Sequence, residues 1–149
     1  MAFTKIKYSK GDVSLAWKDD LPRTVITHEL NCGDPPRPEF VVALAAFATY
    51  LLDIAELDSG WNRNLTIQSV AISENDQGRG IVVTGLKKVA QAASPIVINT
   101  PFLSELASYE GGPQLPRYAI GMLDALEVEA GKYRQGERAQ TDLFPKKVA

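Results

Sequence analysis

The side chains of the first thirty residues alternate in short segments that predict three strands. Phe3–Tyr8 and Val13–Lys18 each repeat with a period of two, which is typical of a half-buried strand. Gly11-Asp12 lies between them and favours a turn, so the two segments predict a hairpin. Thr24–Leu30 is rich in β-branched residues, which favour a third strand.

A helical pattern follows a stretch that contains three prolines. We expect one helix from Glu39 to about Asp58, ended by Ser59-Gly60. Within it, Phe40–Leu52 is apolar except at Thr49, and it is too short to span a bilayer. A helix that is apolar on almost every face is buried on several sides, so we expect it under the sheet or between subunits.

The second half of the chain repeats this order of elements. Leu65–Ser73 alternates clearly, and the polar segment Glu74–Gly80 separates it from Ile81–Val89, so these residues predict another hairpin. Pro95–Asn99 predicts a short sixth strand, and Thr100-Pro101 has the residue types that open a short helix.

A final helix is predicted from about Pro116, because apolar residues recur there at three- and four-residue spacing. These residues are Ala119, Met122, Leu123, Leu126, Ala130 and Tyr133. The order three strands, helix, three strands, helix predicts an α+β fold with a largely antiparallel sheet. We expect one domain over residues 1–136 and a short flexible tail over 137–149. The repeated order suggests an internal pseudo-repeat, although no residue-level repeat supports it.

Composition narrows the class of protein. The 149 residues are 45% hydrophobic, which suits one compact domain, and the net charge of −2 disfavours non-specific binding to duplex DNA. Cys32 is the only cysteine, so we expect no internal disulfide and a reducing, cytoplasmic setting. Residues 1–10 lack an apolar signal-peptide segment, and we expect no membrane association.

The chain shows no recognisable catalytic set. His28, the only histidine, precedes Cys32 by four residues, but no further His or Cys completes a metal site. Asp53 and Glu56 share a helix face, and a solvated helix end explains them better than acid–base chemistry. We therefore expect no enzyme activity, no metal and no cofactor.

Basic residues near aromatic ones suggest a second kind of site. Aromatic side chains beside cations on a sheet are typical of proteins that bind single-stranded nucleic acid. The candidate residues are Lys5, Lys7, Trp17, Arg79, Lys87 and Lys88. The same residues serve equally well as core anchors and solvated charges.

The C-terminal residues carry the most specific motif. Gln140-Thr141-Asp142-Leu143-Phe144 resembles the pentapeptide with which bacterial polymerases and repair proteins dock on the replicative sliding clamp. In that pattern Gln140 is the polar anchor, Asp142 the spacer, and Leu143 and Phe144 the apolar plugs, whereas Thr141 replaces the more usual Leu. The alternative is that Phe144 packs on the folded body.

Across nearly its whole length the chain resembles an uncharacterised group of bacteriophage proteins found among replication and recombination genes. The residues that carry this resemblance are Pro38-Glu39-Phe40, Ala43-Leu44, Ser94–Pro101, Glu129-Ala130, Tyr133, Gly136, Arg138-Ala139-Gln140 and Leu143-Phe144. The resemblance implies a phage origin, the cytoplasm of an infected bacterium and a role in DNA metabolism. It implies no catalytic residues.

Our leading hypothesis is a non-enzymatic phage accessory protein whose tail docks on the host DNA polymerase sliding clamp. One alternative is a single-stranded DNA-binding or annealing module. Another is a counter-defence protein that sequesters a nucleotide signal in a pocket between subunits. The apolar first helix permits a homo-oligomer.

Overall fold

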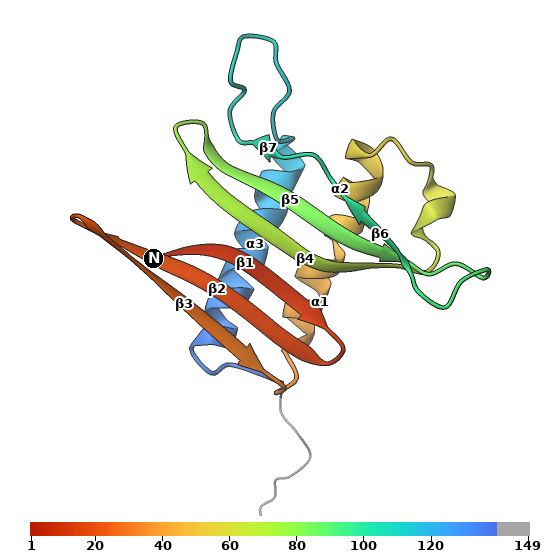
Figure 1. Cartoon of the computed structure of the whole chain (residues 1–149), viewed down its shortest axis with the longest axis horizontal. Helices are drawn as coiled ribbons and strands as arrows, with labels where there is room; N and C mark the ends of the chain where they lie inside the picture. Colours follow the sequence, from red (N-terminus) through yellow and green to blue (C-terminus); the bar gives the residue numbers. More distant parts are fainter. Residues whose placement is uncertain (140–149) are drawn as a thin grey trace, which may run out of the picture.

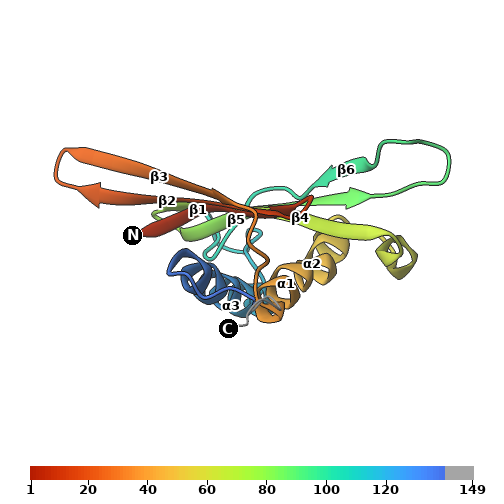
Figure 2. The same ribbon diagram turned by 90° about the horizontal axis from the view of Figure 1, so that it is seen from below.

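The protein forms one seven-stranded sheet whose helices all lie on the same face (Figure 1; Figure 2). The computed structural model describes residues 1–139. Within these residues every strand pair is antiparallel, so the predicted α+β class with an antiparallel sheet is confirmed. None of the helices formed by residues 1–139 lies on the opposite face of the sheet (Figure 2).

Three strands form a meander at the start of the chain: β1 (Ala2–Ser9), β2 (Asp12–Leu21) and β3 (Thr24–Cys32). Strand β2 continues beyond the predicted end at Lys18, because its last residues pair with the start of β3 as far as Leu21 and Thr24. The β1–β2 turn needs two residues with positive φ. Lys10 and Gly11 meet this need, with φ values of 54° and 82°.

The first helical region differs from the single helix predicted. It consists of α1 (Pro38–Ala45) and α2 (Phe47–Ile54), and a short 3-10 helix, η1 (Ser59–Asn62), follows. Helix α2 ends before the predicted Asp58 because Glu56 takes a left-handed conformation with φ of 57°. The Leu57 N–H then donates to the Leu52 carbonyl at 2.9 Å, which closes the last turn as a glycine usually does.

Within the single chain this helical region is buried on one side, under the sheet, and the alternative of burial between subunits stays a prediction. Phe40, Leu44, Phe47 and Tyr50 face the sheet and are almost fully buried. Val42 on the other side is 68% exposed. An apolar surface therefore remains on the outer side of α1 in the part of the chain that the structure describes.

The second meander contains β4 (Leu65–Asn75), β5 (Gly78–Lys87), β6 (Ile96–Asn99) and β7 (Leu103–Ser104). The predicted loop Glu74–Gly80 shrinks to a tight turn, because the two strands pair out to Asn75 and Gly78. The turn is held by the Gln77 N–H, which donates to the Asn75 side chain at 2.8 Å.

Strands β6 and β7 follow one edge of β5, and the helix predicted at Thr100-Pro101 does not form. Thr100 instead forms hydrogen bonds with the sheet. Its hydroxyl accepts from the Val83 N–H at 2.9 Å, and its own N–H donates to the Val83 carbonyl at 3.0 Å. The predicted helix cap is therefore a connection between two edge strands.

Helix α3 (Arg117–Arg134) lies where the apolar stripe predicted it. Five members of that stripe are fully buried against the sheet and α1: Ala119, Leu123, Leu126, Ala130 and Tyr133. Together with α1 and α2, this helix covers the core on one face of the sheet (Figure 2).

The two meanders meet along a very short seam. The sheet order is β3-β2-β1-β4-β5-β6, so β1 and β4 are the central strands. They pair through only three residue pairs: Lys5 with Ala71, Ile6 with Val70 and Lys7 with Ser69. Beyond this seam the strands diverge (Figure 1). The predicted order of three strands and a helix, repeated once, differs from the structure, which has two α-helices after β3 and four strands, β4 to β7, before α3.

Candidate binding groove and tail exit

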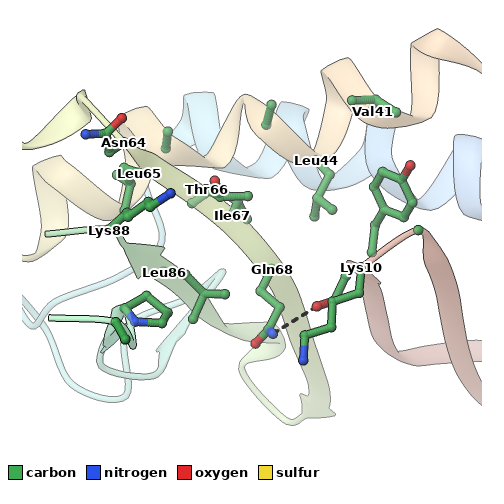
Figure 3. A pocket seen from close by; sticks show the side chains of 17 residues that line it. Lys10, Val41, Leu44, Asn64, Leu65, Thr66, Ile67, Gln68, Leu86 and Lys88 are labelled. Carbon is green, nitrogen blue, oxygen red and sulfur yellow. Dashed lines mark hydrogen bonds between the residues drawn. The ribbon is translucent and has the colours of Figure 1, made fainter. Parts of the chain in front are cut away.

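A groove of about 710 Å³ opens where β1 and β4 separate (Figure 3). One wall is the start of β4, from Leu65 to Gln68, and the other is the end of β1 with its turn, from Tyr8 to Gly11. Gln68 closes the groove toward the seam, because its side-chain amide donates to the Ser9 hydroxyl at 3.3 Å. We call this site the seam groove.

The floor of the seam groove is apolar and comes from the helices. Val41, Leu44 and Ala45 of α1 line it together with Ala48 of α2. Because two of these side chains are alanines, the helices leave open space beneath the gap between the strands. The volume of the groove lies within the range of small-molecule sites.

The rim of the seam groove is positively charged. Lys10 and Lys88 lie on opposite sides of it (Figure 3). No Asp or Glu belongs to its lining, although the whole chain has a net charge of −2. The groove therefore favours anionic groups over cationic ones.

A second groove lies between the outer sides of α1 and α3. Its volume is about 650 Å³, and its walls include Val42, Ala46, Met122 and Val128. Val42 and Val128 are 68% and 57% exposed. This apolar surface is available to a second copy of the chain, and the homo-oligomer stays a prediction.

The last described residues are fixed to the body beside the end of β3. The Ala139 N–H donates to the Pro35 carbonyl at 3.0 Å. Arg138 donates to the Asp34 carboxylate at 2.7 Å, and its guanidinium lies 4.4 Å from the ring centre of Tyr133. The predicted clamp-docking residues Gln140, Asp142, Leu143 and Phe144 lie outside the described residues.

Tyr133 also holds α3 to the segment that follows β3, close to Arg138 and Ala139. Its hydroxyl donates to the Asp34 carbonyl at 2.7 Å. Burial raises the pKa of the Tyr133 hydroxyl well above its ordinary value, with further contributions from Cys32 and Asp34. Tyr133 is therefore a neutral donor that ties α3 to the segment after β3.

The structure separates the residues predicted to bind single-stranded DNA. Lys5 and Lys7 flank the buried Ile6 on β1, so their side chains point to the face of the sheet that carries no helix. Trp17 lies on the opposite face, where it stacks on His28 at 5.3 Å and lies under Arg134. The predicted stacking surface and these two cations therefore do not share a face.

Arg79 is held by acidic side chains. It binds Glu105 at 3.0 Å, Asp124 at 2.8 Å and Glu127 at 2.5 Å. The hydrogen bonds that Arg79 donates to Glu105 raise the pKa of Arg79 further, in opposition to its burial. Its guanidinium is thus committed to intramolecular ion pairs.

The remaining two candidates lie near the other end of β5. Lys87 donates to the Arg63 carbonyl and lies 5.9 Å from the ring centre of Trp61. Lys88 lines the seam groove. Of the six predicted residues, Lys88 alone belongs to that groove.

Residues considered for metal or nucleophile chemistry have ordinary partners. His28 is 2.9 Å from the Asp19 carboxylate, and the Cys32 sulfur accepts from Arg138 at 3.3 Å. Asp53 accepts from the Tyr118 hydroxyl at 2.6 Å. Among residues 1–139, no three His, Cys, Asp or Glu side chains gather as metal ligands.

Sequence reasoning missed the seam groove. Its walls come from the alternating segment at Leu65 and from the turn at Lys10, which are far apart in the chain. The one local signal was the all-round apolar pattern of Phe40–Leu52, which indicated more apolar surface than one sheet contact can bury. That pattern did not show where in the fold the exposed apolar surface would line a groove.

Comparisons with protein-family models, with curated proteins and with solved structures each gave no match to the chain. The resemblance to bacteriophage proteins stays a prediction. Over residues 1–139, no helix has the length and apolar character that crossing a membrane requires.

Proposed function

We propose that the protein is a phage accessory protein of DNA metabolism that docks on the host replicative sliding clamp through its C-terminal pentapeptide. The folded body acts as a binding module and performs no catalysis. The observation that carries the proposal is the position of the motif: it begins at Gln140, directly after Arg138 and Ala139, whose hydrogen bonds hold them to the body.

The core of the described body supports this assignment. Its buried cluster is built from both meanders and the three α-helices, and the largest fully buried side chains include Tyr50, Phe40 and Leu123. The described residues thus form one continuous core. Burial of those two side chains in a groove of the clamp would stabilise the complex by about 1.5–3 kcal/mol each.

Calorimetric titration of the purified clamp with the full-length protein tests the proposal. We expect a dissociation constant in the micromolar range, because ordering the tail offsets part of the gain from burial. A Leu143→Ala/Phe144→Ala variant should bind at least about a hundredfold more weakly. Equal binding by wild type and this variant would discard the docking role.

A substitution at position 141 provides a matched control that should strengthen clamp binding rather than weaken it. The family pattern more often has Leu where this chain has Thr141. Thr141→Leu adds apolar surface without removing an anchor, so it should tighten clamp binding severalfold. A general effect of tail substitutions would instead weaken binding in both variants.

Single-stranded DNA binding is a second candidate, favoured by Lys5 and Lys7 on the uncovered face of the sheet. The residues around them there include Ala16, Ala71 and Glu29. Binding on this face would depend on charge, so it should fall steeply with salt. Absence of oligonucleotide binding at low salt would remove this candidate.

A further inference from the structure

The seam groove exposes a strand edge inside the sheet. From Leu65 to Ile67, β4 pairs with β5 on one side, whereas its pairing with β1 begins only at Ser69. Within residues 1–139 no strand is paired with this part of β4 on its β1 side. Such an edge can accept an additional strand through its backbone N–H and carbonyl groups.

An extended segment beside β4 would have two different environments for its side chains. Successive side chains of a strand point to opposite faces of the sheet. One set would contact the apolar floor formed by Val41, Leu44, Ala45 and Ala48, and the other set would face the side without helices. The groove therefore fits a sequence in which apolar residues alternate with polar ones.

The positive charge of the groove rim indicates which polar side chains a docked segment would carry. Lys10 and Lys88 are the charged residues of the lining, and they lie on opposite sides of the groove (Figure 3). Carboxylates in a docked segment would be attracted by both lysines, and cationic side chains would be repelled. Neither lysine has an ion pair with an acidic residue of the described part.

We propose that the seam groove binds an extended segment of a partner protein, in which apolar side chains alternate with carboxylates, by strand addition to β4. This inference goes beyond clamp docking. It uses residues of the body alone and names a second interaction of the same molecule.

Fluorescence anisotropy with synthetic peptides and the full-length protein tests this proposal. The probe is a labelled decapeptide of alternating Val and Glu, for which we expect a dissociation constant on the order of 10–100 μM. The control peptides are alternating Val and Lys, and five Val followed by five Glu. Both controls should bind at least tenfold more weakly, because one reverses the charge and the other breaks the alternation.

Variants of the groove locate the binding. Lys10→Asn/Lys88→Gln should weaken the alternating Val-Glu peptide at least tenfold, and Asn suits the positive φ at position 10. Ala45→Trp should abolish binding by filling the floor. Lys5→Gln/Lys18→Gln removes the same charge outside the groove and should leave the affinity unchanged. Thermal unfolding by circular dichroism verifies that each variant is folded.

Several outcomes would overturn the proposal. One is absence of peptide binding, and another is equal binding by the Lys10→Asn/Lys88→Gln variant and wild type. A ten-nucleotide oligothymidylate that loses affinity with the groove variants would assign the groove to nucleic acid. Tighter peptide binding by Leu143→Ala/Phe144→Ala would assign it to the chain's own tail. Failure of clamp docking alone would leave the peptide results unchanged, so the two proposals fail separately.

Discussion

Two buried tyrosine hydroxyls have opposite hydrogen-bonding states. Tyr133 donates to the Asp34 carbonyl at 2.7 Å, whereas the Tyr50 hydroxyl is buried with no hydrogen-bond partner among residues 1–139. Burial, with a smaller effect of Asp53, raises the pKa of Tyr50 to about 12, so both hydroxyls are neutral at physiological pH.

These states predict different effects of removing each hydroxyl. Tyr133→Phe should lower the free energy of unfolding by about 1 kcal/mol, because the Asp34 carbonyl loses its donor. Tyr50→Phe should be neutral or stabilising, because it removes a polar atom that has no partner. Urea denaturation of both variants measures the difference. A loss for Tyr50→Phe as large as that for Tyr133→Phe would contradict this assignment.

The ion pair between Arg79 and Glu105 predicts a pH dependence of stability. Hydrogen bonds from Arg79 lower the pKa of Glu105 below its ordinary value of 4.5. The carboxylate therefore contributes stability above pH 4.5, and this contribution is lost as the pH falls further through the pKa of the folded protein. Burial raises the pKa of neighbouring Glu127, so protonation of that group has the opposite effect.

A single substitution separates the Glu105 contribution from the rest. Glu105→Gln should lower the free energy of unfolding at pH 7 by about 1–3 kcal/mol, because Arg79 loses a charged acceptor. The difference from wild type should shrink below pH 4.5. Thermal unfolding from pH 7 to pH 3 measures it, with Glu110→Gln in the same exposed loop as the control. A difference that stays constant over this range would contradict the assignment.

Among the elements, β5 and α3 each contain a glycine with a different role. A Cβ atom at Gly85 of β5 would lie 2.7 Å from Leu51 and 3.2 Å from Leu65, and Leu51 is fully buried. A Cβ atom at Gly121 of α3 would have no neighbour within 4 Å. Close approach of α2 to the sheet therefore depends on Gly85.

We predict opposite signs for alanine at these two positions. Gly85→Ala should lower the free energy of unfolding by about 1–3 kcal/mol, because Leu51 has no room to move away. Gly121→Ala should raise it by about 0.5–1 kcal/mol, since alanine restricts the unfolded chain and favours the helix. Chemical denaturation measures both, and equal effects would be inconsistent with the packing of α2 on β5.

Local pattern predicts most of these elements but not all of their ends. Alternation at Leu65–Ser73 and the apolar stripe of α3 are properties of neighbouring residues, so both elements were predictable. The end of α2 was not, because Glu56 takes a conformation that glycine usually occupies. The prediction of a helix at Thr100 was wrong because contacts with Val83, seventeen residues away, determine the conformation of Thr100.

At the scale of the whole molecule, the seam between β1 and β4 determines the candidate site. Its three residue pairs join segments more than sixty residues apart in the chain. Pairing between such distant segments cannot be recognised from the pattern of neighbouring residues. The sequence therefore predicted an antiparallel sheet but did not predict the groove. The tail motif, by contrast, is a local pattern and is found from the sequence alone.

The two proposals divide the molecule into two interaction sites. Tail residues from Gln140 onward would bind the clamp, and the seam groove beside Leu65 would bind an acidic, apolar segment of another protein. A protein with both sites would place its partner at the clamp and raise the local concentration of that partner there.

The most direct test of docking by the tail is nuclear magnetic resonance of the ¹⁵N-labelled full-length protein with added unlabelled clamp. We predict that the amide signals of residues 140–144 change most at saturating clamp, while the chemical shifts of residues lining the seam groove stay as they are in the free protein. Unchanged signals for residues 140–144 in the presence of saturating clamp would contradict the account.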